Sequence, residues 1–226
     1  MFATEIAEGG FAVIPNVLAA GEISSVLDRV QLSTIRRSRA GIRHLMSDPD
    51  VAALAHDPRL LTIGRQVLGN DVVPFRATLF DKSQDANWLV VWHQDTALPL
   101  RSKKDISGWG PWSVKEGINY AHAPTHALDR VVALRLHLDD STFENGPLRV
   151  IPETHKLGVL TDDEVFQLSN DRVAVDCCAA RGAVLAMRPL LIHSSSKSQT
   201  ERPRRVLHIE YAASTVMGDG LELAVA

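Results

Sequence analysis

Hydrophobic residues in the first part of the chain recur with the period of an α-helix. Residues 18–30 show this most clearly, because their isoleucine, leucine and valine side chains fall on one helical face. Residues 50–68 have the same period, and a short extended piece, residues 11–15, precedes both. We therefore expect residues 1–70 to form mostly helical support for the core that follows.

The hydrophobic pattern changes to that of β-strands after residue 70. Short alternating or apolar runs are separated by Gly, Pro and Asn turns. The expected strands are residues 72–81, 88–93, 130–139, 148–152, 172–176, 183–187 and 206–211. Many short strands predict a sandwich or a barrel with helices added at the N-terminus. Residues 98–129, which are long, irregular and bear Trp, Gly and Pro, are expected to form an active-site loop or lid.

Composition narrows the class of protein without naming a function. The 226 residues are 45% hydrophobic, which suits one folded domain spanning residues 1–226. With 24 basic and 27 acidic residues, the net charge of -3 predicts no nucleic acid or membrane partner. The only cysteines, Cys177 and Cys178, are adjacent, and no secretory signal is visible. We expect a cytoplasmic protein of unknown oligomeric state.

Candidate chemistry is concentrated in the run Trp92-His93-Gln94-Asp95. In a strand, His93 and Asp95 project to the same side because side chains alternate across a sheet. His193, at the end of an apolar run, is the best third ligand. Two histidines and one carboxylate, with open positions opposite, form the site of non-haem Fe(II) oxygenases. The alternative is that the His-x-Asp pair is a chance occurrence.

An arginine cluster follows His193. Arg204 on the next strand could reach into a barrel and hold a carboxylate bidentately. The alternative is that Arg202, Arg204 and Arg205 are solvated turn charges. Alternation along the chain does not choose among these three residues.

Several ordered stretches resemble the phytanoyl-CoA dioxygenase family of Fe(II)/2-oxoglutarate oxygenases. The matching stretches are residues 79–83, 87–95, 134–140, 144–152 and 155–156, then 189–193 followed by Arg204. Their order and spacing cover about residues 72–212, and the N-terminal part fits more loosely. The resemblance implies a double-stranded β-helix, a cupin-like jelly-roll barrel over residues 71–212 with iron at its open end.

The resemblance also assigns roles to individual residues. It implies that His93, Asp95 and His193 bind iron. Arg204 matches the position that grips the distal carboxylate of 2-oxoglutarate, and Ser195 matches a hydroxyl that assists it. Thr78 is on the strand that faces this cosubstrate, and Lys82 shares its face if the strand is regular. Halogenating relatives carry a small residue in place of Asp95, so the aspartate favours hydroxylation.

Three further residues are candidates for substrate contact or for support of the site. Gln94 points away from the ligands in a regular strand, although the resemblance places it near the site. Arg135 faces either solvent or the barrel lumen; the resemblance favours the lumen, where it could bind a substrate carboxylate. Trp112, with Trp109, either forms an apolar lid or anchors the loop over residues 98–129 to the barrel.

These residues together predict a dioxygenase that uses Fe(II), 2-oxoglutarate and O₂. It would hydroxylate a small-molecule metabolite and release succinate and CO₂. No strongly basic patch suggests a site for the phosphates of coenzyme A. Two alternatives stay open: a metal-dependent oxygenase on the same barrel that does not use 2-oxoglutarate, and a non-catalytic binding protein of this fold.

Overall fold

The larger of two facing sheets forms the base of the barrel. A computed structural model of the chain describes residues 2–32, 37–38, 41–69, 71–83, 86–218 and 220–226. The larger sheet has seven strands in the order β1-β12-β9-β14-β4-β3-β2, and every neighbouring pair is antiparallel. The strands are β1 (Phe11–Ile14), β2 (Arg37–Ser38), β3 (Gly41–Ile42), β4 (Val73–Lys82), β9 (Val131–His137), β12 (Val184–Met187) and β14 (Arg204–Ala212).

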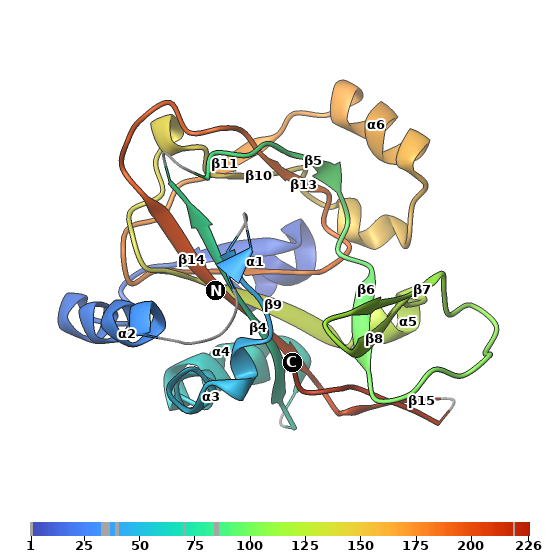
Figure 1. Cartoon of the computed structure of the whole chain (residues 1–226). Helices are drawn as coiled ribbons and strands as arrows, with labels where there is room; N and C mark the ends of the chain where they lie inside the picture. The colour runs from blue at the N-terminus through green and yellow to red at the C-terminus, as the bar shows by residue number, and fades with distance from the viewer. Residues whose placement is uncertain (1, 33–36, 39–40, 70, 84–85, 219) are drawn as a thin grey trace.

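The smaller sheet faces the central strands of the larger one (Figure 1). Its order is β11-β10-β13-β5, again antiparallel. These strands are β5 (Val90–His93), β10 (Leu148–Val150), β11 (Val175–Cys177) and β13 (His193–Ser195). Two facing antiparallel sheets with helices outside confirm the expected jelly-roll barrel, which is mainly β with helices at the N-terminus. The larger sheet takes three strands from before residue 70, so this part of the chain supplies more than helical support.

Helices from the N-terminal part cover the outer face of the larger sheet (Figure 1). They are α1 (Phe2–Gly9), α2 (Ala20–Leu32), α3 (Pro49–Ala55) and α4 (Pro58–Leu68), with a 3-10 turn η1 (Leu45–Ser47). Alternate strand residues such as Leu134, Leu136 and Leu207 pack against helix residues such as Ile23 and Leu60. Alternation therefore sends one set of side chains to this core and leaves the other set facing the lumen.

The helix expected over residues 50–68 is two helices, which corrects the prediction. Helix α3 ends at Ala55 with His56 as its C-cap, and Asp57 caps α4 by accepting a hydrogen bond from the backbone N–H of Arg59 at 2.8 Å. Pro58 is the first residue of α4. A proline has no N–H to donate and its ring clashes with the preceding turn, so one continuous helix cannot run through Pro58. The apolar period continues across this break, which is why the sequence pattern suggests a single helix.

Residues 98–129 are only partly irregular, which is a second correction. Apart from residues 101–111, most of them lie in a three-stranded sheet of order β6-β8-β7 and a short helix. These elements are β6 (Ala97–Leu100), β7 (Trp112–Lys115), β8 (Ile118–His122) and α5 (Thr125–Leu128). Leu98, Leu100 and Trp109 are buried in one apolar cluster with Phe75 from β4. This contact fixes the segment at one end of the barrel.

The remaining elements close the ends of the molecule. Helix α6 (Asp162–Asp171) lies over the outer face of the smaller sheet (Figure 1). Two 3-10 turns, η2 (Phe143–Asn145) and η3 (Thr154–Leu157), precede it, and β15 (Val216–Gly218) pairs with β16 (Leu221–Glu222) near the C-terminus. Among the described residues, no helix has the length and apolar character needed to cross a membrane.

Candidate active site

The structure brings the three expected metal ligands together. His93 ends β5, Asp95 follows it, and His193 begins the neighbouring strand β13. His93 and His193 are direct partners in the antiparallel register, and their ring centroids are 4.2 Å apart. The Nε2 atoms of His93 and His193 lie 3.7 and 3.6 Å from the carboxylate oxygens of Asp95. One ligand atom from each of the three residues lies within 4.8 Å of the others.

Hydrogen bonds orient both imidazole rings for a metal. Nδ1 of His93 is 2.8 Å from the carbonyl oxygen of Val91, and Nδ1 of His193 is 2.8 Å from that of Leu191. A carbonyl oxygen only accepts, so each Nδ1 is the donor and each Nε2 keeps its lone pair. The lone pairs face the point that Asp95 also faces.

The charges of the three residues also suit a divalent metal. Burial lowers the pKa of His193 to about 4, so this ring is neutral near pH 7. Burial raises the pKa of Asp95, but His193 and His93 outweigh it and hold that pKa well below its usual range. Two imidazoles and one carboxylate are the donor set of a non-haem Fe(II) centre, and the residues present fit it.

A row of polar side chains lines the lumen face of the larger sheet. On β4 this face carries Lys82 and Thr78, both predicted to face the cosubstrate. The register places Lys82 opposite Arg204 and Thr78 opposite His208. In the next strand, Arg135 is the partner of His208. Residues far apart in the sequence thus form rows across the floor of the barrel.

One end of this floor is a buried cationic cluster. Lys82 Nζ donates to Ser195 Oγ at 2.8 Å, and Arg204 Nη2 donates to the same oxygen at 3.2 Å. Burial, together with Arg204 and Arg135, lowers the pKa of Lys82 to about 7. Burial lowers the pKa of Arg204 to about 9. Within the described part of the chain no carboxylate pairs with Lys82 or Arg204, so the cluster has the charge to accept an anion.

Gln94 and Trp112, both singled out in the sequence, contact the scaffold. Gln94 Nε2 donates to the carbonyl oxygens of Gly158 and Leu190 at 2.9 and 2.7 Å, and its Oε1 accepts from Leu160 N–H at 2.9 Å. Its amide therefore ties β5 to the segments beside the ligands. Trp112 is half-buried and packs against the cluster that holds Trp109. This contact favours an anchor over a lid.

Arg135 lies in the lumen and is buried, with 7% of its surface exposed. Its Nη1 is 3.1 Å from His208 Nδ1, and its guanidinium lies 5.2 Å from the ring centroid of Phe80. Burial and Arg135 lower the pKa of His208 well below its usual value. His208 is then neutral and accepts from Arg135, so Arg135 has a hydrogen-bond partner but no countercharge there.

Sequence reasoning did not identify a second polar group at the opposite end of the floor. Arg76 forms a close ion pair with Glu210, and its Nη1 donates to the carbonyl oxygen of Ala97 at 3.0 Å. Tyr120 lies beside this pair, with its hydroxyl 3.0 Å from His44 Nε2. The available signal was alternation: Arg204, His208 and Glu210 have the spacing of one strand face.

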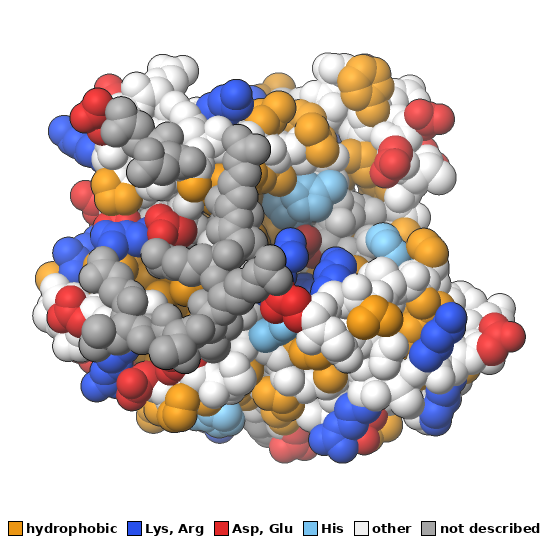
Figure 2. Space-filling model, viewed as in Figure 1, with side chains coloured by type: hydrophobic (Ala, Val, Ile, Leu, Met, Phe, Trp, Pro, Cys, Tyr) orange, Lys and Arg blue, Asp and Glu red, His pale blue; other side chains and the backbone are white. Residues whose placement is uncertain are grey.

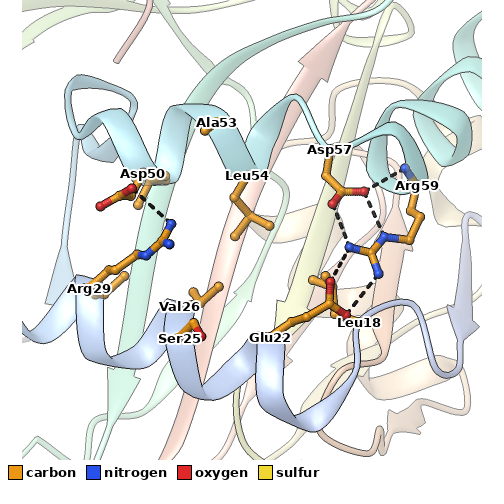
Figure 3. A pocket seen from close by; sticks show the side chains of 12 residues that line it. Leu18, Glu22, Ser25, Val26, Arg29, Asp50, Ala53, Leu54, Asp57 and Arg59 are labelled. Carbon is orange, nitrogen blue, oxygen red and sulfur yellow. Dashed lines mark hydrogen bonds and ion pairs between the residues drawn. The ribbon is translucent and has the colours of Figure 1, made fainter.

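Two hollows on the surface differ in whether their charged groups are paired. Figure 2 shows a hollow near the middle of one face, with histidine on one side of it and Lys or Arg on the other. A separate groove of about 310 Å³ lies between α2 and α3 (Figure 3). In that groove Arg59 pairs with Glu22 and Asp57, and Arg29 pairs with Asp50. The charged groups that the structure describes in this groove form ion pairs with one another, so none of them is left unpaired for a ligand. The candidate active site is therefore in the barrel and not in this groove.

A jelly-roll barrel with a His-x-Asp pair and a distant histidine in its lumen defines a class of non-haem metal proteins. The chain belongs to the phytanoyl-CoA dioxygenase family, because the family model described as phytanoyl-CoA dioxygenase (PhyH) matches residues 34–206. An L-proline trans-4-hydroxylase from Streptomyces griseoviridis is 28% identical over 192 residues, which are 73% of this chain and 63% of the relative. An ectoine dioxygenase from Bordetella bronchiseptica is 25% identical over 164 residues, 65% of this chain and 46% of the relative.

The chain therefore spans about half to two thirds of the length of these curated relatives. Among solved structures, EctD from S. alaskensis with bound Fe has a TM-score of 0.70 at 20% identity, covering 93% of this chain and 75% of that one. The epimerase SnoN in complex with Fe3+, alpha ketoglutarate and nogalamycin RO has a TM-score of 0.71 at 20% identity, covering 95% and 83%. These similarities show that the fold is shared.

Proposed function

We propose that the protein is an Fe(II)- and 2-oxoglutarate-dependent dioxygenase that hydroxylates a small-molecule metabolite. One observation carries the proposal: His93, Asp95 and His193 converge in a lumen whose floor also holds the buried cations Lys82 and Arg204. A metal site and a separate anion site in one cavity suit a cosubstrate that chelates iron at one end. Relatives named as a proline hydroxylase and an ectoine dioxygenase support the same reading.

Each residue has a role in this proposal. Iron and 2-oxoglutarate, when bound, supply the oxidising chemistry that uses O₂ and yields succinate, CO₂ and a hydroxylated product. His93, Asp95 and His193 hold the metal from one side. Lys82, Arg204 and the Ser195 hydroxyl bind the distal carboxylate through charge-assisted hydrogen bonds.

Supporting residues keep this arrangement in place. Thr78 lies on the floor between the cations and the far end of the lumen. Gln94 holds the strand that carries the ligands, and the segment over residues 98–129 forms a wall of the substrate pocket. Halogenating relatives carry a small residue in place of Asp95, which leaves a site for halide. The aspartate in this chain therefore supports hydroxylation. Both cysteines are free, which supports the cytoplasm as the location.

Anaerobic metal binding tests the proposal directly. The wild-type protein should bind stoichiometric Fe(II), and added 2-oxoglutarate should produce a charge-transfer absorption. Asp95→Ala and His193→Ala should lose the iron, whereas His56→Ala, which changes a histidine on the helical side, should keep it. Stoichiometric iron in Asp95→Ala, or no absorption in the wild type, would count against the proposal.

The affinity for the cosubstrate separates this proposal from its nearest alternative. Arg204→Ala should weaken 2-oxoglutarate binding by about tenfold or more, because a buried charge-assisted contact is lost. Titration of the charge-transfer absorption measures this change. An unchanged affinity would favour an oxygenase on the same barrel that does not use 2-oxoglutarate.

A further inference from the structure

A second group of cations surrounds Tyr120, at the end of the floor away from Lys82. Arg76 comes from β4, Lys115 from β7, Tyr120 from β8, and Arg43 from the turn after β3. Lys115 Nζ lies 4.8 Å from the centroid of the Tyr120 ring, and the Arg76 guanidinium carbon lies 5.9 Å from it. Tyr120 is buried, whereas Arg43 and Lys115 are exposed. Separate elements thus bring one buried phenol and two cations together, and Arg43 directly precedes His44, whose ring stacks on Tyr120 with the centroids 6.2 Å apart.

Positive charge exceeds negative charge in this group. Glu210 neutralises Arg76. Glu116 lies 3.2 Å from His44, whose pKa is lowered by burial, so this carboxylate offsets one of the two remaining cations, Lys115 and Arg43. Among the residues that the structure describes, no carboxylate pairs with Lys115 or Arg43. Burial lowers the pKa of Lys115, and Arg43 and Arg76 lower it further. Mutual repulsion among cations is relieved when an anion binds between them.

The cluster adjoins the metal centre. Nη1 of Arg76 donates to the carbonyl oxygen of Ala97, two residues after Asp95, at 3.0 Å, and the strand that begins at Ala97 pairs with the strand that carries Tyr120. Arg76 and Lys82 share a face of β4 but are six residues apart, which is about 20 Å along a strand. In the proposed function both carboxylates of 2-oxoglutarate are already engaged, one by Lys82 and Arg204 and one by the metal. The cations around Tyr120 are therefore left for another anion.

We infer that Arg76, Lys115 and Tyr120 form the subsite for a carboxylate of the primary substrate, which is a small carboxylic acid. This inference rests on the proposed function, because the subsite adjoins its metal centre. A carboxylate has two oxygens in one plane, which suit the ammonium of Lys115 and a guanidinium. Bound there, the substrate extends its carbon skeleton from the wall formed by β7 and β8 toward the metal.

Paired ligands test the inference on the full protein. Small cyclic and branched carboxylic acids, including imino acids, are each compared with their primary amides. Binding to anaerobic protein loaded with Fe(II) and 2-oxoglutarate is followed by the change in the charge-transfer absorption and by calorimetry. Acids should bind at least about tenfold more tightly than their amides, because each amide lacks the charge-assisted contacts.

Matched variants locate the effect. Lys115→Gln should weaken binding of the acids by about tenfold and leave the amides and 2-oxoglutarate unaffected. Lys103→Gln removes the same charge from an exposed site in the same segment and should change nothing. Equal binding of acids and amides, no binding of any acid, or equal effects of the two substitutions would overturn the inference.

Failure of the proposed function would give a different result. In that case the wild-type protein would show no charge-transfer absorption before any acid is added. Calorimetry of acids and amides on the metal-free protein would then still compare wild type with Lys115→Gln. A preference for acids that Lys115→Gln removes would support the subsite, and no preference would overturn it.

Discussion

Lys82 is an ammonium group held inside the barrel between a hydroxyl and a guanidinium. Its exposed fraction is 1%, and its Nζ donates to Ser195 Oγ at 2.8 Å. Burial, Arg204 and Arg135 together lower its pKa to about 7. A buried ammonium with a lowered pKa destabilises the folded protein while it is charged. Because Lys82 has this cost, we assign it to ligand binding.

Replacing Lys82 should therefore stabilise the metal-free protein and weaken cosubstrate binding. At pH 6 the lysine is charged in both the folded and the unfolded chain, and Lys82→Met should raise the free energy of unfolding by about 1–3 kcal/mol. As the pH rises above about 7 the folded protein loses this proton before the unfolded chain does, so the wild type gains stability and the difference shrinks.

Denaturant unfolding of the metal-free wild type and Lys82→Met at pH 6 and pH 9 measures this effect. Lys103→Met serves as the control, because its ammonium is exposed and should matter little at either pH. A stability difference that does not change with pH would contradict the assigned charge of Lys82. So would an unchanged affinity of Lys82→Met for 2-oxoglutarate.

The junction of α3 and α4 shows how one residue sets the course of a longer element. Asp57 caps α4 through the backbone N–H of Arg59, and the Arg59 side chain also joins Asp57 to Glu22 of α2 (Figure 3). Nearby, the hydroxyl of Tyr211 donates to the carbonyl oxygen of Ala55 at 2.9 Å. The cap and this buried hydrogen bond together hold both helices against the larger sheet.

Removal of the cap should be measurable separately from removal of the ion pair. Asp57→Ala should lower the free energy of unfolding by about 1–2 kcal/mol, because an orphan N–H at the start of α4 loses its acceptor. Asp57→Asn keeps an oxygen that can cap the helix and loses only the charge, so its cost should be smaller. Chemical denaturation compares the two, and equal losses would show that the ion pair dominates.

Elements with a strong pattern were predictable, and elements defined by tertiary contact were not. The long strands β4, β9 and β14 alternate clearly, and their bounds come close to those expected. Strands β6, β7 and β8 have four or five residues each, and two of them contain or follow proline, so no period is visible. They exist because Trp109 and its neighbours bury against Phe75. Sequence alone does not contain that contact.

The same distinction holds for the site. His93 and Asp95 are two residues apart in a strand, so their convergence follows from local geometry. The ion pair of Arg76 with Glu210 depends on the register between β4 and β14, which joins residues far apart in the chain. His208, which the sequence suggests is a surface or hydrogen-bonded residue, is buried on this floor and lies 3.1 Å from Nη1 of Arg135.

At the scale of the whole molecule, the two sheets contribute different groups to the lumen. The smaller sheet and the residues that follow β5 supply the proposed metal ligands, and the larger sheet supplies the cationic floor. The outer face of the larger sheet is mostly apolar and covered by helices, whereas its lumen face carries Lys82, Arg204 and Arg135. Without an anion, that lumen concentrates the positive charges of Lys82, Arg204 and Arg135 in a space of low dielectric constant. The stability of the whole barrel should therefore respond to ligands that neutralise them.

Thermal unfolding in the presence of two matched keto acids tests this response. Under anaerobic conditions with Fe(II), 2-oxoglutarate at about a hundred times its dissociation constant should stabilise the folded protein by about 2.7 kcal/mol. For a chain of this size that corresponds to a rise in Tm of about 5–10 °C. At the same concentration, 2-oxopentanoate has the same keto-acid end but lacks the distal carboxylate, so it should give a much smaller rise. In Arg204→Ala the advantage of 2-oxoglutarate should largely disappear, because the guanidinium that pairs with the distal carboxylate is gone. Equal stabilisation of the wild type by both keto acids would show that the cationic floor does not bind this carboxylate, and would leave only the metal to account for binding.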